Sequence, residues 1–297
     1  MAQHPETCPA ELRHVIERYV ARELSTEMAL MHGVLVLRDA ATLMSALDAL
    51  ARNAPDSCEL RELSRLAAEH PSELANTAAL VQSGVVDLPP ARADAIAFIR
   101  NQFDAAVARA PEASVALYSL GSAKVLEQAT AEIVERLDEW KLLSPAPDVF
   151  DIGCGIGRVE RALATRVRSM RGVDVSPGMI AEAKRRCADL VNTEFFVSDG
   201  HSLAAFLDRS ADLVLAVDSF PYLFAADPAI AAQHVKDARR MLRAGGALLI
   251  LNFSYRGDYK VDMTDVSRLA AENGLTIERA GTRDFRLWDG LTYLLRS

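Results

Sequence analysis

The stretch that decides the fold is Asp151-Ile-Gly-Cys-Gly-Ile-Gly-Arg158, which follows the apolar pair Val149-Phe150 and precedes a helical pattern. Its three glycines therefore lie in a turn between a strand and a helix. Glycine has no Cβ and adopts positive φ freely, so a ligand can approach the backbone of such a turn closely. The helix N-terminus behind the turn offers free N–H groups and positive dipole character. The stretch predicts a ligand-binding turn.

Two common phosphate-binding motifs fit this turn poorly. Counting from Gly153 and Gly155, the third glycine of the NAD fingerprint would stand at position 158. Arg158 occupies that position, and its side chain is too large for close contact with a pyrophosphate. The Gly-Lys-Ser/Thr ending of a P-loop is absent as well. A nicotinamide oxidoreductase is therefore a disfavoured alternative.

The turn resembles motif I of the class I S-adenosylmethionine-dependent methyltransferases. In that family an acidic residue opens the motif, and the glycine turn faces the methionine half of the cofactor. The resemblance implies S-adenosylmethionine as cofactor, S-adenosylhomocysteine as its product, and no metal. It implies cofactor contacts from Asp151, Gly153, Cys154, Gly155, Gly157 and Arg158.

A second acid, Asp174, ends a strand candidate about twenty residues after the glycine turn, in Gly172-Val-Asp-Val-Ser-Pro177. A carboxylate at this place can accept hydrogen bonds from both hydroxyls of a ribose. NAD enzymes share this spacing, so Asp174 indicates a nucleoside without choosing the cofactor. Capping of the next helix is the alternative use of its carboxylate.

The resemblance extends the nucleoside site to the adenine side. Met179 resembles the apolar residue that packs on adenine, with ordinary core packing as the alternative. Asp199 resembles the acid that accepts a hydrogen bond from the adenine amino group, with a surface turn as the alternative. We expect their neighbours Val175, Gly200 and His201 to line the same site.

Strand and helix patterns alternate beyond Pro111, which predicts an α/β fold with a mostly parallel sheet and helices on both faces. The resemblance spans about Asp148 to Arg296 and implies a Rossmann-like sheet of seven strands with an antiparallel last strand. The paired glycines of Leu242-Arg-Ala-Gly-Gly-Ala belong to it, with Ala244 at the family's usual proline. The strand candidates are Asp148–Ile152, Met170–Asp174, Thr193–Val197, Ala211–Val217, Ala247–Phe253, Leu275–Ala280 and Leu291–Leu295.

The first 110 residues read as helical nearly throughout, with weak strand-like alternation only at Gly33–Leu37 and Val85–Leu88. We therefore expect a helical cap, lid or oligomerisation domain at 1–110, the last giving a homodimer, and a cofactor-binding domain at 111–297. Tyr118 lies in a segment that in many relatives folds over the cofactor, which implies contact with its methionine end.

Leu60–Asp87 loosely resembles a helix-turn-helix, so a DNA-binding regulator that senses the cofactor is an alternative. Its second helix, at 72–83, contains no lysine or arginine, and DNA binding usually needs them. The net charge of −8 also disfavours nucleic acid and anionic membranes. The four cysteines are scattered, and no signal peptide or membrane span stands out, so we expect a cytoplasmic protein.

Acceptor-binding residues should lie in the loops after the fourth and fifth strands, since functional residues concentrate on loops held by a rigid scaffold. Asp218 can take a proton or bind an amine, and it also borders the cofactor. Tyr222 and Tyr255 can orient a substrate, and Arg256 can hold a carboxylate or phosphate. Ser219 and Phe220 complete the substrate candidates, and His201 is a candidate base.

The sequence thus predicts transfer of a methyl group from S-adenosylmethionine to a small molecule. Basic patches are absent, and Asp218-Ser-Phe-Pro-Tyr222 only partly matches the Asn/Asp-Pro-Pro-Tyr motif of nucleobase and glutamine methylation. A protein that binds the cofactor without transferring its methyl group remains an alternative. The acceptor atom is left open.

Overall fold

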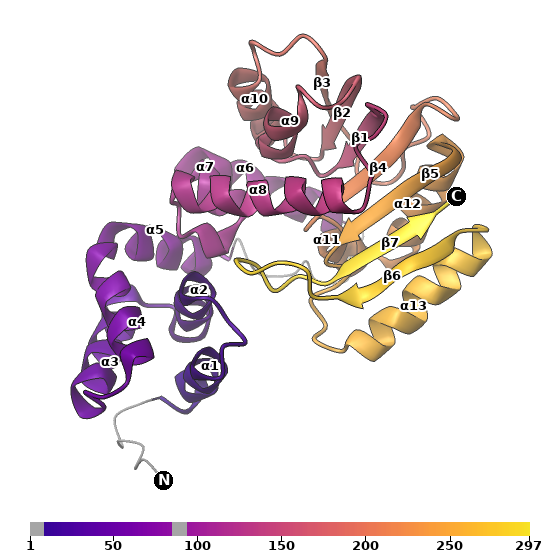
Figure 1. Cartoon of the computed structure of the whole chain (residues 1–297). Coiled ribbons are helices and arrows are strands. Elements are labelled where there is room, and N and C mark those ends of the chain that lie inside the picture. The colour runs from indigo at the N-terminus through magenta and orange to yellow at the C-terminus, as the bar shows by residue number, and fades with distance from the viewer. Residues whose placement is uncertain (1–8, 85–93) are drawn as a thin grey trace. The chain divides into compact units, whose positions relative to one another are not determined.

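The computed structural model describes residues 9–84 and 94–297 (Figure 1). The chain divides into two compact units. Unit 1 comprises Met1–Asp87, Arg109–Ala129 and Arg286–Asp289, and unit 2 comprises Leu88–Ala108, Thr130–Phe285 and Gly290–Ser297. The division is therefore not a single cut near residue 110, because the chain passes repeatedly between the units. The strand-like pattern at Val85–Leu88 lies outside the described residues.

Helices are the only regular secondary structure in the described part of unit 1. Its helix α2 (Thr26–Leu37) is apolar on nearly all sides and contacts four other helices, which is the pattern of a central buried helix. The weak strand-like alternation at Gly33–Leu37 lies within this helix, where Gly33 and Val34 are buried and Val36 is exposed. The other elements are α1 (Ala10–Val20), α3 (Ala40–Asn53), α4 (Cys58–Glu69), α5 (Pro71–Gln82), α7 (Pro111–Val115) and the 3-10 turn η1 (Leu117–Ser119).

Two further helices lie partly or almost wholly in unit 2. Helix α6 (Ala95–Arg109) lies almost wholly in unit 2, although its sequence position suggested the N-terminal domain. Helix α8 (Ala123–Glu139) begins in unit 1 and continues in unit 2, where it leads to the first strand.

Among the described residues, seven strands form one sheet in the order β3-β2-β1-β4-β5-β7-β6. The neighbours from β3 to β5 pair in parallel, and β7 pairs antiparallel with both β5 and β6. The predicted fold class is confirmed, including the inserted antiparallel last strand. The strands are β1 (Asp148–Ile152), β2 (Ser169–Asp174), β3 (Thr193–Val197), β4 (Ala211–Val217), β5 (Leu242–Leu251), β6 (Thr276–Thr282) and β7 (Thr292–Arg296).

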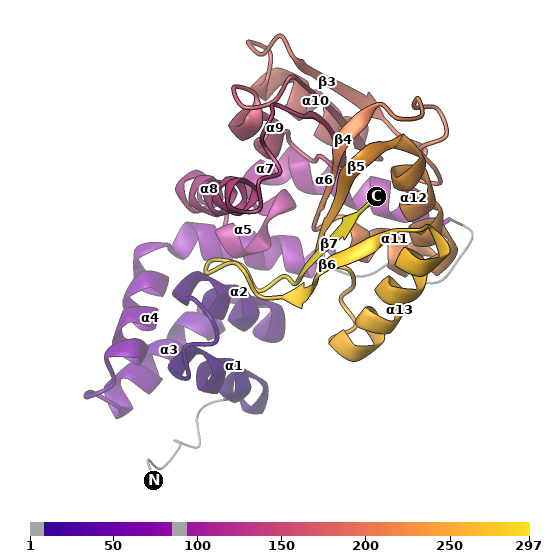
Figure 2. The ribbon, with the colours of Figure 1, turned by 45° about the vertical axis from the view of Figure 1, so that its right-hand side comes forward.

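Helices cover both faces of this sheet. In Figure 2 the sheet is seen nearly edge-on, with α9 (Arg158–Leu163) and α10 (Pro177–Arg186) on one side. The other side carries α11 (Phe220–Ala226), α12 (Pro228–Met241) and α13 (Tyr259–Glu272). Because successive strand side chains alternate between faces, each strand contributes to both layers.

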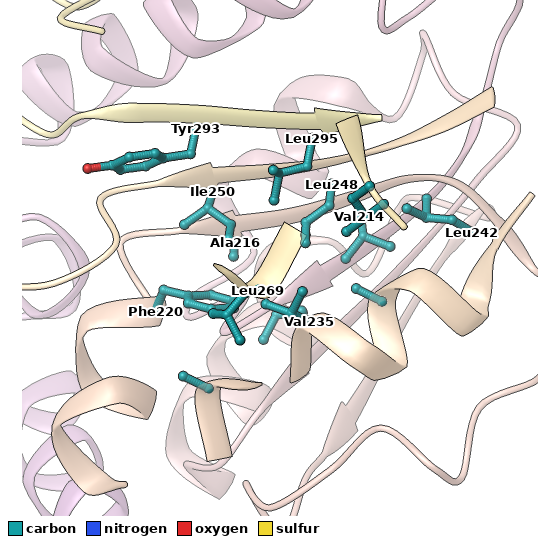
Figure 3. Close-up of a cluster of buried hydrophobic side chains, with 14 of the residues drawn as sticks. Val214, Ala216, Phe220, Val235, Leu242, Leu248, Ile250, Leu269, Tyr293 and Leu295 are labelled. Carbon is teal, nitrogen blue, oxygen red and sulfur yellow. The ribbon is translucent and has the colours of Figure 1, made fainter. Parts of the chain in front are cut away.

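A large core cluster fills the space between the sheet and helices α11 to α13. Side chains of β4, β5 and β7 meet those of the helices there, as Figure 3 shows. Each such buried aliphatic side chain contributes about 1.5–3 kcal/mol relative to exposure. The labelled members are Val214, Ala216, Phe220, Val235, Leu242, Leu248, Ile250, Leu269, Tyr293 and Leu295. This core fixes the carboxyl ends of the parallel strands along one edge.

The strand order reverses between β1 and β4, since the chain runs from β1 outward to β3 and then returns to β4. Ligands of open α/β sheets bind at the carboxyl ends of the strands beside such a reversal. The glycine turn after β1 and the loop after β4 both begin there, which makes this edge the candidate site.

Candidate active site

The glycine turn takes a backbone course that side chains would obstruct. Gly153, Gly155 and Gly157 all have positive φ, at 75°, 54° and 75°. A Cβ on Gly153 would lie 2.4 Å from Cβ of Ser219. The N–H groups of Gly153 and Cys154 both donate to the Val173 carbonyl, which ties the turn to β2. The turn is therefore rigid and bare of side chains at the three glycines.

Asp174 joins this turn to the loop that follows β2. Its Oδ2 accepts the N–H of Gly155 at 3.0 Å, and its Oδ1 accepts the N–H of Ser176 at 2.9 Å. Burial raises the pKa of this carboxyl to about 6. Each carboxylate oxygen has two lone pairs, so each can accept a further bond. The residues present therefore fit a ribose whose two hydroxyls donate to Asp174.

Helix α6 holds the same loop from a distant part of the sequence. Asp104 Oδ1 accepts both the Ser176 hydroxyl and the Gly178 N–H, at 2.5 and 2.8 Å. Arg100 Nε donates to the Val175 carbonyl at 3.1 Å. Three of the four residues after Asp174 are thus fixed by one helix. No sequence pattern indicated this role, because a helical pattern does not show which loop a helix will contact.

The expected adenine side contains both buried and exposed residues. Gly200 has φ 79°, and a Cβ there would lie 2.7 Å from Val175 Cγ1 and 2.8 Å from Ile96 Cγ2. Met179 is buried, which fits either adenine contact or core packing. Asp199 is exposed, and its Oδ1 accepts the N–H of His201 at 2.8 Å. Its adenine role stays a prediction beside this local turn.

A polar cluster stands at the carboxyl ends of β4 and β5. Asp218 Oδ1 accepts Nδ2 of Asn252 at 2.9 Å and the hydroxyl of Tyr255 at 2.8 Å. Asp218 and Asn252 both have left-handed backbones, with φ 58° and 71°. Such strained non-glycine residues concentrate at functional sites. Sequence reasoning selected Asp218 and Tyr255 but missed Asn252, although it stands in the loop that was singled out.

Aromatic rings surround this cluster. Tyr222 meets Tyr255 edge to face at a centroid distance of 5.6 Å, and Phe103 of α6 meets Tyr222 at 4.9 Å. Loss of hydration and then the nearby Asp218 charge raise the pKa of both tyrosine hydroxyls. The ring of Tyr255 is nevertheless 42% exposed, so the cluster is open to solvent on one side. Neutral hydroxyls can orient a bound acceptor.

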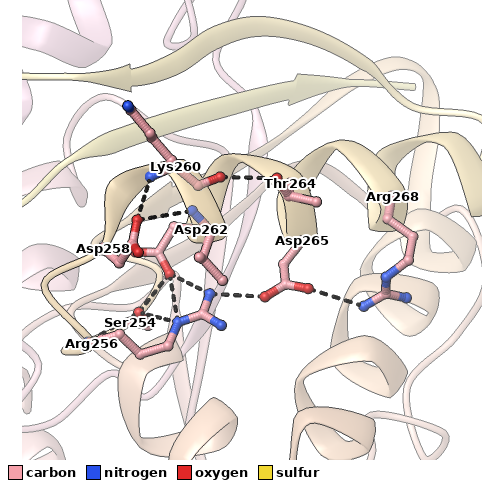
Figure 4. Close-up of polar contacts among 9 residues, drawn as sticks. Ser254, Arg256, Asp258, Lys260, Asp262, Thr264, Asp265 and Arg268 are labelled. Carbon is pink, nitrogen blue, oxygen red and sulfur yellow. Dashed lines mark hydrogen bonds and ion pairs between the residues drawn. The ribbon is translucent and has the colours of Figure 1, made fainter.

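Several other candidates have different surroundings. Figure 4 shows Arg256 held by Asp262 and Asp265 of α13, and its guanidinium lies 4.4 Å from the Phe224 ring. Phe220 is fully buried in the core, and Ser219 donates to the Ile152 carbonyl. None of these placements supports the expected substrate contacts.

His201 is exposed, and no hydrogen bond between its side chain and the Asp218 cluster is present in the described part of the chain. Tyr118 belongs to unit 1, where its ring stacks on Trp288 at a centroid distance of 6.4 Å. Catalysis by His201 and cofactor contact by Tyr118 both stay predictions.

Residues 9–84 and 94–297 contain neither a metal-binding cluster nor a membrane-spanning helix. No group of three or more His, Cys, Asp or Glu side chains there is arranged to hold a metal ion. No helix in these ranges combines the length and apolar character that crossing a membrane requires.

The fold and the site define a nucleoside-binding α/β protein with a second polar cluster beside the nucleoside loop. Residues 149–246 match the family model of the methyltransferase domain. The match identifies a methyltransferase domain within the chain, and its sheet has the Rossmann-like order of the class I S-adenosylmethionine-dependent enzymes.

Curated relatives share parts of this chain. It is 30% identical to 2-methyl-6-phytyl-1,4-hydroquinone methyltransferase of Synechocystis sp. over 145 residues, which are 48% of this chain and 44% of the relative. It is also 30% identical to demethylmenaquinone methyltransferase of Tropheryma whipplei over 108 residues, or 36% and 42% of the two chains. The chain thus spans less than half the length of these relatives.

Solved structures share the fold at low sequence identity. Magnesium protoporphyrin IX methyltransferase from Synechocystis PCC 6803 has a TM-score of 0.51 and 17% identity, covering 70% of this chain and 99% of that chain. Phosphoethanolamine N-methyltransferase 1 of Haemonchus contortus has a TM-score of 0.50 and 18% identity, covering 68% and 48%.

Proposed function

We propose that this protein is an enzyme that transfers a methyl group from S-adenosylmethionine to a small-molecule acceptor. The observation that carries the proposal is the bond network through Asp174, which joins the glycine turn to the loop after β2. It prepares a carboxylate for a ribose at the edge where α/β sheets bind ligands. When bound, the cofactor supplies an electrophilic methyl group on a sulfonium.

The chain's own residues then have to position the acceptor and exclude water, since in-line substitution depends on alignment. The Asp218 cluster supports this role, because it combines a carboxylate, a tyrosine hydroxyl and aromatic surfaces beside the glycine turn. Asp218 would accept the acceptor's proton or orient its donor group, and Asn252 and Tyr255 would hold that carboxylate in place.

The charges at this cluster favour a neutral or cationic acceptor. Asp218 contributes a carboxylate, and the nearby cation Arg256 is already paired with Asp262 and Asp265. An anionic group would be repelled by the Asp218 carboxylate there, which costs free energy at low local dielectric. The relatives named for hydroquinone and demethylmenaquinone substrates are consistent with an uncharged ring as acceptor.

Two experiments test the proposal in order. Isothermal titration with S-adenosylmethionine, S-adenosylhomocysteine and NAD should give binding to the first two only. A screen with labelled methyl donor should then label neutral hydroxyl- or amine-bearing small molecules in preference to phosphorylated ones. Binding of NAD alone would refute the cofactor. Tight binding of S-adenosylmethionine with no labelled product across the screen would favour a protein that binds the cofactor without transferring methyl.

We also propose the remaining organisation from the sequence. Residues 1–110 would act as a cap or as the contact of a homodimer, with α6 also supporting the loop after Asp174, and 111–297 would supply the residues that bind the cofactor. The protein would work in the cytoplasm without a nucleic-acid partner, as its charge of −8 favours. Light scattering of the purified chain measures its oligomeric state, and a salt-dependent DNA shift would contradict the last statement.

A further inference from the structure

Glu160 is a fully buried carboxyl group without a donor. It lies on α9 at 0% exposure, and neither of its oxygens has a hydrogen-bond partner within the described residues. Asp151, at the end of β1, is 1% exposed, and its Oδ1 is equally unpartnered in that part of the chain. An ionised carboxylate buried in this way would cost several kcal/mol. At least one of the two carboxyl groups therefore has to be protonated.

The two carboxyl groups lie side by side. Asp151 pairs with Gly172 in the parallel register of β1 and β2, so both residues face the same side of the sheet. Oε1 of Glu160 lies 2.5 Å from where a Cβ of Gly172 would stand. Glu160 thus fills the space that Gly172 leaves empty, on the same side of the sheet as Asp151, so a proton held by one carboxyl group can be donated to the other.

Charged groups around the pair act on it in opposite directions. Arg158 of α9 attracts both carboxylates while donating to Thr130 of α8 at 2.9 Å. Asp174 repels them from the end of β2, and the thiols of Cys154 and Cys187 border Glu160 from the turn and α10. Burial raises the pKa of Asp151 to about 7 and that of Glu160 well above its usual range.

We infer that Glu160 is a positioning residue that shares a proton with Asp151 and so couples the charge behind the glycine turn to the binding of a cationic ligand. The inference rests on the proposed function, which supplies that ligand: S-adenosylmethionine carries an α-ammonium and a sulfonium. A cation near Asp151 stabilises the ionised form of the pair. Binding therefore releases a proton from the pair to solvent, and no other bond forms or breaks.

The test counts protons. Titration calorimetry of the full chain with S-adenosylmethionine at pH 6.5, in two buffers of different ionisation enthalpy, should show release of a substantial fraction of one proton. At pH values below the pKa of the pair, the affinity for S-adenosylmethionine should rise by up to about tenfold per pH unit. 5′-Methylthioadenosine, which lacks both cationic groups, should bind without this release.

Two variants identify the residue responsible. Glu160→Gln keeps a donor for Asp151 but cannot ionise, so it should bind S-adenosylmethionine with the proton release abolished and the pH dependence reduced. Asp237→Asn is the matched control, because Asp237 is a buried carboxyl of α12 whose donors are Leu203, Gln233 and Arg240. This control should leave the proton count unchanged.

The outcomes separate the two proposals. No heat with either adenosyl compound would refute the proposed cofactor. Binding of S-adenosylmethionine by the natural chain without proton release would overturn the shared proton. Equal release by the natural chain and Glu160→Gln would overturn the role of Glu160. Infrared difference spectra of the free chains supply a readout independent of ligand: the band of a protonated carboxylic acid should be present and should be lost in Glu160→Gln.

Discussion

Asn252 donates a hydrogen bond of 2.9 Å from Nδ2 to Oδ1 of Asp218, and both residues hold left-handed backbones at the ends of adjacent parallel strands. A left-handed backbone costs a non-glycine residue roughly 1 kcal/mol or more. Two such residues bonded to one another show that the loops after β4 and β5 are organised around the Asp218 carboxylate.

Removal of the Asp218 charge should therefore affect chemistry more than cofactor binding. Asp218→Asn should lower kcat by about 10²–10⁴-fold if Asp218 acts as a general base. Tyr255→Phe removes one of its donors and should lower kcat less, by roughly tenfold. Steady-state kinetics with the acceptor from the labelling screen measure both effects. Tyr259→Phe, at an exposed ring, is the matched control and should leave kcat unchanged. A kcat for Asp218→Asn within threefold of the natural chain would contradict the role.

Loss of the Asp174 carboxylate should instead remove cofactor binding. Asp174→Ala deletes the acceptor that we propose for two ribose hydroxyls, and it also deletes the acceptor of the Gly155 and Ser176 N–H groups. We expect the Kd for S-adenosylhomocysteine to rise by about 100-fold or more. Asp199→Ala should raise it by about tenfold or less, because Asp199 is exposed and already accepts a local N–H. The reverse ranking in calorimetry would invalidate the assignment of Asp174.

Asp104 should affect the same affinity from α6. Asp104→Ala frees the Ser176 hydroxyl and the Gly178 N–H, so the loop after Asp174 loses two of its anchors. We expect the Kd for S-adenosylhomocysteine to rise by about tenfold while kcat at saturating cofactor stays near its natural value. Asn101→Ala, at an exposed position of the same helix, is the control. A fall in kcat at unchanged Kd would show that α6 acts on the reaction and not on the loop.

Gly172 should tolerate no side chain. A Cβ there would lie 2.5 Å from Oε1 of Glu160 and 2.7 Å from Cβ of Cys154, and the Cys154 atom is close to the backbone. Overpacking of this kind costs about 1–3 kcal/mol, so Gly172→Ala should lower the free energy of unfolding by that amount. Urea denaturation measures it. Adding Glu160→Ala should recover only part of the loss, because the Cys154 contact remains.

The raised carboxyl pKa values make stability depend on pH in a defined direction. Asp151 and Asp174 titrate in the native chain at about 7 and about 6, above the ordinary value for Asp. Between about pH 4 and pH 7 these two groups therefore bind more protons in the native state than in the unfolded state, and their contribution to the free energy of unfolding falls as the pH rises. Each proton contributes a slope of up to about 1.4 kcal/mol per pH unit.

Buried His234 acts in the opposite sense near neutrality, since burial lowers its pKa. The measurement therefore compares Asp151→Asn with the natural chain by denaturation at pH 5, 6, 7 and 8. The variant should lose less stability as the pH rises. Parallel curves for the two proteins would contradict burial as the cause.

The sequence predicted the strands of the sheet and the Asp174 loop because each strand and this loop leave a pattern in neighbouring residues. The glycine turn, the acid that follows it and the alternation of apolar strands are all local patterns. Asp104 and Asn252 were missed because their partners lie far away in the chain, 72 to 74 residues from Asp104 and 34 residues from Asn252. Glu160 was missed because its place depends on the space that Gly172, 12 residues away, leaves empty. Phe220 and Arg256 were selected by residue type, which does not distinguish a core ring or an ion pair from a substrate contact.

The return of Arg286–Asp289 to unit 1, between β6 and β7, has an evolutionary consequence. Neither unit corresponds to one uninterrupted length of coding sequence. Recombination at a single junction could not pass either unit whole to another gene, as it can with domains arranged in tandem. A chimaera joined near residue 110 would combine segments of both parents within each unit.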